Sequence, residues 1–261
     1  MASTSLKSPN ERSVELNEVN WWSNWDQVKW LSSDAYVMFS DRFPEYFFNR
    51  GGFVAIAEGM EKSIERMERE FAARRLVPHI FVQKTGKESE ITRLLAEKNY
   101  KVEDQMLVME LDDNCFHANP DVKVEIVQED QLEEWARTYL TAFYSETSLL
   151  STVLDIVRAV IRLEHVSMVL SSLHDQPAGT LALFRSDSLC GVYCVGSRPE
   201  FRRKHVATTM LEFAYRTAER EGRRLILQTI LSDLVEDLYL KAGFKTAYVK
   251  DLFVKRDGVN T

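Results

Sequence analysis

The pattern of hydrophobic and polar residues predicts helices and strands along most of the chain. Apolar residues recur at helical spacing over 59–75, 89–97, 129–143, 149–163, 206–221 and 234–241. Apolar or alternating runs predict strands over 35–39, 78–82, 102–111, 122–127, 166–173, 178–185, 189–195, 225–230 and 246–254. We also expect a short helix over 26–31 and Ser89 as the N-cap of the helix that follows it. This order predicts an α/β protein with a mixed sheet.

Composition shifts along the chain suggest its domain organisation. Residues 112–121 are polar and contain proline, two asparagines and three aspartates, which is typical of a linker. The linker predicts an N-terminal domain over 14–115 and a C-terminal domain over 122–261. Residues 1–13 are polar, and we expect them to be disordered. The aromatic residues gathered in 19–48 are expected to pack in the core.

A basic turn joins the strand at 189–195 to the helix that begins at Val206. Arg202, Arg203 and Lys204 form a run of three cations just before this helix. The first N–H groups of a helix have no partner inside it, and the helix dipole adds positive potential at the same place. A strand, a basic turn and a helix N-terminus together predict a phosphate-binding site.

The residues of this turn resemble the acetyl-CoA motif of the GCN5-related N-acetyltransferases, the GNAT superfamily. That motif reads Arg/Gln-x-x-Gly-x-Gly/Ala, and residues 202–207 occupy its six places. Arg202 and Ala207 match, whereas His205 stands where the family usually has glycine. Histidine tolerates a positive φ better than most residues.

A second segment, over 232–244, supports the same family. Leu238, Tyr239, Gly243 and Phe244 match its Leu-Tyr-x-x-x-Gly-Phe pattern, and Ser232 replaces the usual asparagine. The resemblance runs from about residue 122 to the C-terminus. It implies the GNAT fold and the direct transfer of an acetyl group from acetyl-CoA to a primary amine.

The resemblance also assigns roles to residues. It implies that acetyl-CoA is bound by Val195, Gly196, Ser197, Arg202, Arg203, Lys204, His205, Val206, Ala207, Thr208 and Ser232. Tyr239 is the candidate general acid, because a phenol with a pKa near 10 is protonated at neutral pH and can donate to the departing thiolate. Tyr144 and Glu146 are candidate contacts of the acceptor amine.

Other roles stay open at this point. Glu146, Asp187, Glu200 or water could take the proton of the amine. The acceptor is a small-molecule or peptide amine, and nothing in the sequence identifies it. A protein that binds or senses acyl-CoA without turnover is the alternative function, and an adaptor that no longer binds CoA is a third. The histidines are not clustered, so no metal is expected.

An internal similarity links the two halves of the chain. Residues 94–101 align with 238–245, and each segment precedes an alternating strand. We interpret the N-terminal half as a diverged GNAT-like copy, although two ordinary helix–turn–strand joints could also align by coincidence. Leu95 stands where Tyr239 stands, so this copy is expected to be inactive.

Charge and composition narrow the functional classes. The net charge is −7, from 33 lysines and arginines against 40 acidic residues, so we do not expect nucleic-acid binding. Three scattered cysteines and the absence of an apolar leader or a long apolar run predict a cytoplasmic protein without disulfides or membrane association. A homodimer is compatible with the sequence, which does not fix the oligomeric state.

Overall fold

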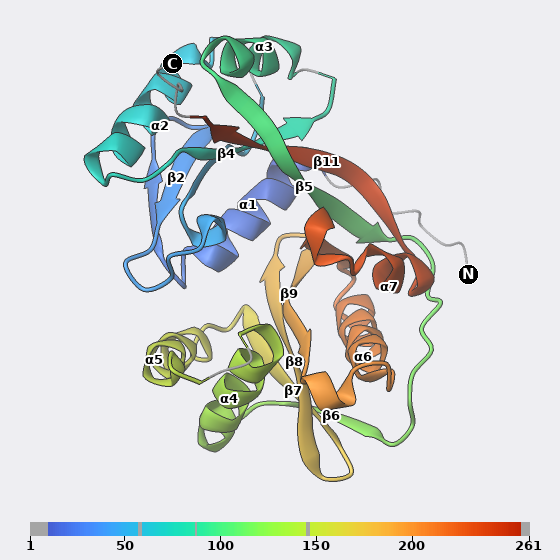
Figure 1. Ribbon diagram of the computed structural model, residues 1–261. Coiled ribbons are helices and arrows are strands. Elements are labelled where there is room, and N and C mark those ends of the chain that lie inside the picture. The colour runs from blue at the N-terminus through green and yellow to red at the C-terminus, as the bar shows by residue number, and fades with distance from the viewer. Residues whose placement is uncertain (1–9, 57–58, 87, 145–146, 257–261) are drawn as a thin grey trace. The chain divides into compact units, whose positions relative to one another are not determined.

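The computed structural model describes residues 10–56, 59–86, 88–144 and 147–256 (Figure 1). These residues form two compact units. The N-terminal unit comprises 10–108, 229–234 and 246–256, and the C-terminal unit comprises 109–228 and 235–245, within the described ranges. Neither unit is a continuous piece of chain, because each takes residues from both halves of the sequence.

The N-terminal unit is a sheet with three helices. The helices are α1 (Glu11–Trp22), α2 (Glu61–Ala73) and α3 (Ser89–Glu97). Its strands are β1 (Gln27–Trp30), β2 (Ala35–Phe39), β3 (Arg50–Phe53), β4 (His79–Lys84) and parts of β5 (Tyr100–Leu111) and β11 (Phe244–Lys255), in the spatial order β1-β2-β3-β4-β11-β5. A short 3₁₀ helix, Tyr46–Phe48, precedes β3, and another spans Leu231–Asp233.

The last strand of the chain pairs with a strand of the N-terminal half. β11 runs antiparallel to β4, from the pair Val249 and Lys84 to the pair Val254 and His79. Residues 246–256 are therefore part of the N-terminal unit, together with residues 229–234. For this reason the compact units do not coincide with the two continuous domains that the linker predicts.

A cluster of buried charges joins α1 to the sheet of the N-terminal unit. The Lys250 Nζ atom lies 3.1 Å from Glu15 Oε2 and also bonds to Glu18, whose other oxygen lies 2.7 Å from Arg50 Nη2. Each of these side chains is at most 2% exposed. Burial favours the neutral amine, but the two glutamates outweigh it and raise the pKa of Lys250.

The same cluster explains why α1 is not predicted from the sequence. The buried face of this helix includes Glu15, Asn17 and Glu18, so its apolar periodicity is weak. The prediction of disorder is wrong for residues 11–13, which form the first turn of α1. Asn10 caps this turn by accepting a hydrogen bond from the Arg12 N–H at 3.0 Å. Residues 1–9 lie outside the described residues.

Three further details of the N-terminal half differ from the predictions. The helix expected over 26–31 is wrong, since residues 27–30 form β1 and pair with β2. Ser89 is the first residue of α3, and Glu88 holds the N-cap position. β3 was not predicted, because its two glycines suggest a turn. Gly52 allows Tyr36 to pack against this strand, since a Cβ atom there would lie 2.8 Å from the tyrosine Oη.

The C-terminal unit carries the basic turn. Its strands are β6 (Val122–Ile126), β7 (Val166–Leu173), β8 (Gln176–Ser186), β9 (Leu189–Ser197) and β10 (Arg224–Ile230, of which residues 224–228 belong to this unit). Its helices are α4 (Leu132–Phe143), α5 (Leu150–Val160), α6 (Val206–Arg220) and α7 (Glu236–Lys241). Neighbouring strands are antiparallel except for β9 and β10, which are parallel. Figure 1 shows α4 and α6 on opposite sides of these strands.

The polar segment 112–121 packs within the C-terminal unit. The N–H groups of Asp112 and Asp113 both donate to the carbonyl of Gly243. This glycine has φ +97°, and a Cβ atom there would lie only 1.9 Å from the Asp113 carbonyl oxygen. Gly243 therefore matches the family pattern for two physical reasons, a left-handed backbone and a close approach of the chain. No helix among the described residues is long and apolar enough to span a membrane.

We expect Lys250→Met to destabilise the protein strongly. The substitution leaves Glu15 and Glu18 buried with too little positive charge, which costs about 3–5 kcal/mol when a buried pair is broken. Urea denaturation measures the loss. Lys84→Met is the matched control on the neighbouring strand, because Lys84 is 46% exposed and lies 3.6 Å from Asp251. The control should lose less than about 1 kcal/mol, and equal losses would contradict this interpretation of the cluster.

Candidate active site

β9 separates from β10 partway along its length. The parallel pairing runs from Leu189 and Arg224 to Val192 and Leu227. Just beyond, the register of β9 against β8 shifts, and Cys194 adopts φ +53°. The Thr180 Oγ1 atom donates to the Cys194 carbonyl at 3.1 Å and holds this bulge in place. The edge of β9 that follows is therefore available to an extended ligand.

A tight loop then connects β9 to α6. Arg203 and His205 both lie in the left-handed region, with φ +61° and +59°. His205 holds the N-cap position of α6, and its side chain makes no capping hydrogen bond. The first N–H groups of the helix are therefore left for another acceptor. The unusual backbone of His205 explains why glycine is common at this place in the GNAT family.

The three cations of the loop keep their charge available. Arg202 Nη2 donates to the Ala142 carbonyl at 3.2 Å and its Nε to the Ser197 carbonyl at 3.5 Å. In the described parts of the chain, no ion pair involves Arg202, Arg203 or Lys204, whereas nearby Arg198 pairs with Glu200 at 2.5 Å. The cations and the helix dipole together create a positive potential that can attract a polyanion.

The segment between the two halves of the sequence supports this loop. Asn119 donates from its Nδ2 to the Lys204 carbonyl at 3.1 Å and from its backbone to Thr209 Oγ1 at 2.9 Å. The Thr208 hydroxyl donates to the His117 carbonyl at 2.9 Å. The sequence predicts only a linker over 112–121, because the pattern of a polar, proline-containing segment does not indicate which residues it contacts.

Two glycines bring helices close to the end of β9. A Cβ atom on Gly196 would lie 2.6 Å from the Phe143 ring and 2.9 Å from Ala142, both in α4. A Cβ atom on Gly179 would lie 2.6 Å from the Gly196 carbonyl and 2.9 Å from Val206. Small residues are needed here, since larger ones would push α4 and α6 away from the strand that leads into the loop.

The structure places most of the predicted cofactor residues in one continuous segment. Residues 195–197 end β9, and 202–208 form the loop and the first turn of α6. Tyr239 belongs to the same unit, on α7, where it is 7% exposed and contacts Phe244 edge-to-face at 6.1 Å between ring centroids. Ser232 belongs to the N-terminal unit, where its hydroxyl donates to Asp104.

The predicted acceptor residues lie at the end of α4. Tyr144 is the C-cap of this helix, and its ring centroid lies 6.3 Å from that of Tyr139. Glu146 lies outside the described residues. Asp187 precedes β9, ten residues before Ser197, which places it at the far end of that strand, roughly 30 Å away. Glu200 pairs with Arg198. The geometry therefore does not single out Asp187 or Glu200 as the base.

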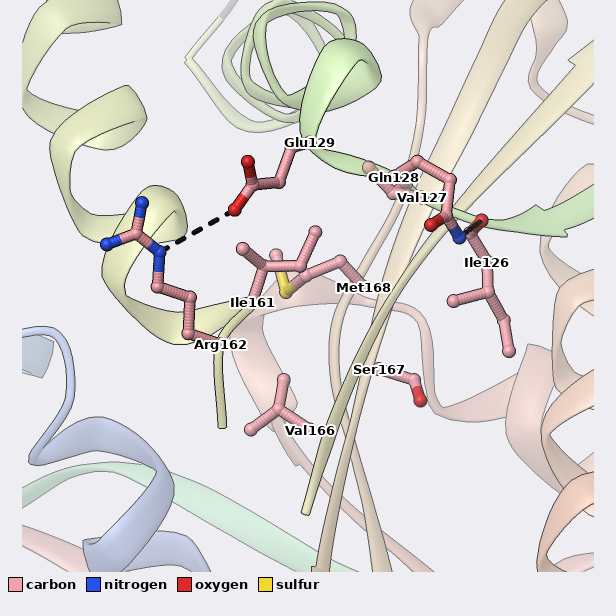
Figure 2. A pocket seen from close by; sticks show the side chains of 9 residues that line it. All are labelled: Ile126, Val127, Gln128, Glu129, Ile161, Arg162, Val166, Ser167 and Met168. Carbon is pink, nitrogen blue, oxygen red and sulfur yellow. Dashed lines mark hydrogen bonds and ion pairs between the residues drawn. The ribbon is translucent and has the colours of Figure 1, made fainter. Parts of the chain in front are cut away.

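A cavity of about 320 Å³ lies elsewhere in the C-terminal unit (Figure 2). It is lined by Ile126, Val127, Gln128, Glu129, Ile161, Arg162, Val166, Ser167 and Met168. Glu129 and Arg162 form an ion pair of 3.6 Å at its rim. Val166 on β7 pairs with Phe184 on β8, and Phe184 pairs with Gly191 on β9. Gly191 lies six residues before the end of β9 that leads into the basic loop. The cavity is thus at the opposite end of the sheet from the basic loop.

Comparison with known proteins identifies the class. Residues 124–244 match the model of the Acetyltransferase (GNAT) family. This match includes the loop at 202–208 and Tyr239, and we conclude that residues 124–244 form a domain of the GNAT family. A search of curated proteins finds no match. Among the described residues, no group of three or more side chains could hold a metal ion.

Solved structures show the same fold at low sequence identity. A GCN5-related N-acetyltransferase from Kribbella flavida has a TM-score of 0.69 at 13% identity, over 97% of this chain and 98% of that one. A GCN5-related N-acetyltransferase from Sphaerobacter thermophilus has a TM-score of 0.67 at 15% identity, over 97% and 96%. A tandem GNAT protein from the clavulanic acid biosynthesis pathway has a TM-score of 0.58 at 11% identity, over 81% and 76%. The chain therefore has a mixed α/β GNAT fold.

The left-handed backbone of His205 makes a prediction about stability. We expect His205→Gly to be about 1–2 kcal/mol more stable than His205→Val, because a Cβ atom is disfavoured in this conformation and glycine has none. Urea denaturation of the two variants measures the difference. The same pair of substitutions at exposed Arg137, inside α4, should give the reverse order. Equal stability of the two His205 variants would contradict a strained loop.

Proposed function

We propose that the C-terminal unit is an N-acetyltransferase that transfers an acetyl group from acetyl-CoA to a primary amine. One observation carries this proposal. The uncapped N-terminus of α6 lies beside three cations without ion pairs, at the end of a strand whose edge is no longer paired. The match of residues 124–244 to the GNAT family supports it. The acceptor would be a small-molecule or peptide amine.

The cofactor would bind in two parts. Its pyrophosphate would accept hydrogen bonds from the N–H groups between Arg203 and Thr208, with the side chains of the basic loop adding charge. Its pantetheine arm would lie along β9 near Val195 and Ser197 and pair with the backbone as an added strand does. A backbone N–H of this strand would also polarise the thioester carbonyl.

Acetyl transfer then needs two proton movements. The neutral amine would attack the thioester carbon, a C–N bond would form, and the C–S bond would break with both electrons leaving on sulfur. Tyr239 would donate its phenolic proton to this thiolate. The proton of the amine would pass to water, since the structure singles out neither Asp187 nor Glu200 as its base. The phenol would recover a proton from solvent.

The N-terminal unit would serve as an inactive copy of the same fold. Leu95 stands at the place of Tyr239, and residues 59–62 at the start of α2 contain no run of three cations. Glu61 in the first turn of α2 would repel a phosphate. Its role would be structural.

A second function would be the binding of acyl-CoA without turnover. Two observations favour it: His205 occupies the usual glycine position, and Ser232 is engaged by Asp104 instead of standing free for the cofactor. Tight binding of acetyl-CoA with no product across a panel of amines would select this function over acetyl transfer.

We expect the double variant Arg203→Ala/Lys204→Ala to bind acetyl-CoA at least about tenfold more weakly. The two side chains supply charge to the pyrophosphate, and hydrogen bonds to charged groups contribute about 1.5–3 kcal/mol. Isothermal titration calorimetry at low salt measures the affinity. Arg158→Ala is the control, because this exposed cation on α5 pairs with Asp155. An unchanged affinity of the double variant would exclude this loop as the cofactor site.

We expect Tyr239→Phe to lower kcat by about 10²-fold, the lower end of the effect of a general acid. The Kd for acetyl-CoA should stay within about twofold of the wild-type value, because the phenol acts on the leaving thiolate. Steady-state kinetics with an active amine and calorimetry provide the two values. Tyr215→Phe is the control, since this hydroxyl lies on the exposed side of α6 and bonds to Glu219. Full kcat in Tyr239→Phe would remove the acid role.

A further inference from the structure

Asn119 contacts the basic loop at a single carbonyl group. Its Nδ2 atom donates to the carbonyl oxygen of Lys204 at 3.1 Å, and its Oδ1 atom accepts from the Asp121 N–H at 3.0 Å. The second bond fixes which end of the side-chain amide is the donor. Asn119 lies before β6, 85 residues from Lys204 along the sequence, so the motif around the loop does not indicate this contact.

The hydrogen bond from Asn119 determines where the N–H of His205 points. In a trans peptide the C=O and the N–H point in opposite directions, and no peptide bond in the described chain is cis. The C=O of Lys204 is directed toward Asn119, so the N–H of His205 is directed away from it. Among the described residues, this N–H has no hydrogen-bond partner.

The strained backbone of His205 favours a different orientation of the same peptide. Rotating the peptide plane between Lys204 and His205 changes ψ of the first residue and φ of the second. A half-turn would take φ of His205 from +59° into the negative region, which residues with a Cβ atom prefer. The rotation would also break the hydrogen bond to Asn119, so this bond opposes the relaxation.

The two orientations of the peptide differ in what they offer to an anion. In the observed orientation, the His205 N–H is left for an acceptor at the start of α6, and successive backbone N–H groups in such a loop can surround an anion. In the rotated orientation, the Lys204 carbonyl would take the place of this N–H. Its oxygen carries partial negative charge and would repel a phosphate.

We propose that Asn119 is a positioning residue, which keeps the His205 N–H oriented for a phosphate by holding the Lys204 carbonyl. The proposal rests on the proposed function, in which this phosphate belongs to the pyrophosphate of acetyl-CoA. Glycine at position 205 would need no such contact, because it adopts both signs of φ with similar ease. The histidine that departs from the family motif therefore makes Asn119 necessary in this chain.

The first test compares Asn119→Ala with the wild-type protein by isothermal titration calorimetry. Acetyl-CoA and ADP both contain the pyrophosphate, and both should bind about tenfold more weakly, the loss expected for one hydrogen bond to a charged group. The factor should be the same at low and high salt, because the substitution removes no charge. With an active amine, KM for acetyl-CoA should rise while kcat stays unchanged.

The second test asks whether glycine at position 205 removes the need for Asn119. In a double-mutant cycle, Asn119→Ala should weaken acetyl-CoA binding by less than about threefold when it is introduced into His205→Gly. Glycine has no strain to relieve, so the peptide has no reason to rotate. A role of Asn119 that only docks the segment 112–121 would not depend on the residue at position 205.

Asn114→Ala is the matched control. Asn114 lies in the same segment, and its Nδ2 atom donates to the Tyr215 hydroxyl at 3.2 Å, on α6 and away from the loop. The substitution removes a hydrogen bond of the same kind, and its affinity for acetyl-CoA and ADP should equal that of the wild-type protein.

Four results would overturn the proposal. If Asn119→Ala binds acetyl-CoA like the wild type, the loop does not need this contact, and the proposed cofactor still stands. If Asn114→Ala weakens binding equally, the segment acts only through its docking. If Asn119→Ala costs as much affinity in His205→Gly as in the wild type, Asn119 does not oppose the strain of His205. If the wild-type protein binds neither acetyl-CoA nor ADP, the proposed function fails together with this inference.

Discussion

The separation of β9 from β10 after the pair Val192 and Leu227 is the constraint on which the rest of the site depends. At Cys194, which has a positive φ, β9 contains one residue more than the facing part of β8. This bulge turns β9 away from β10. This separation frees a strand edge for an extended ligand. The same strand leads into the basic loop, so the free strand edge and the cationic helix N-terminus follow each other along one piece of chain.

The loop between β9 and α6 combines a strained backbone with three cations. Two of its residues are held in the left-handed region, and the helix that follows has no side-chain cap. Native proteins retain such strain where the surrounding structure enforces it. Here the enforcement comes from Gly179 and Gly196, which bring α4 and α6 close to the strand, and from Asn119, which bonds to the loop from the segment before β6. The site therefore depends on parts of the sequence far from the motif.

Much of the fold and the central motif could be predicted from the sequence. Helices with a clear apolar face, such as α2 and α6, and strands of the C-terminal half appear within a few residues of their predicted bounds, because local periodicity reflects burial directly. The basic turn between the apolar strand and the helix pattern likewise predicts the loop from the local sequence alone. The cofactor role of its residues and the acid role of Tyr239 stay predictions.

The remainder depends on contacts that local patterns do not encode. α1 buries Glu15 and Glu18, whose partners Arg50 and Lys250 lie far away in the sequence, so its pattern does not look like that of a core helix. β11 pairs with β4 across more than half of the chain, and this pairing decides which residues form each compact unit.

A thermal-shift titration of the wild-type protein with acetyl-CoA, beside ATP, tests whether the protein has a cofactor site at α6. A ligand at 100 times its Kd stabilises the native state by about 2.7 kcal/mol. In a chain of this size, that corresponds to a rise of about 5 °C or more in melting temperature. We expect this rise with acetyl-CoA and a much smaller one with ATP, which has phosphates but no pantetheine arm. No rise with acetyl-CoA at millimolar concentration would contradict a cofactor site at α6.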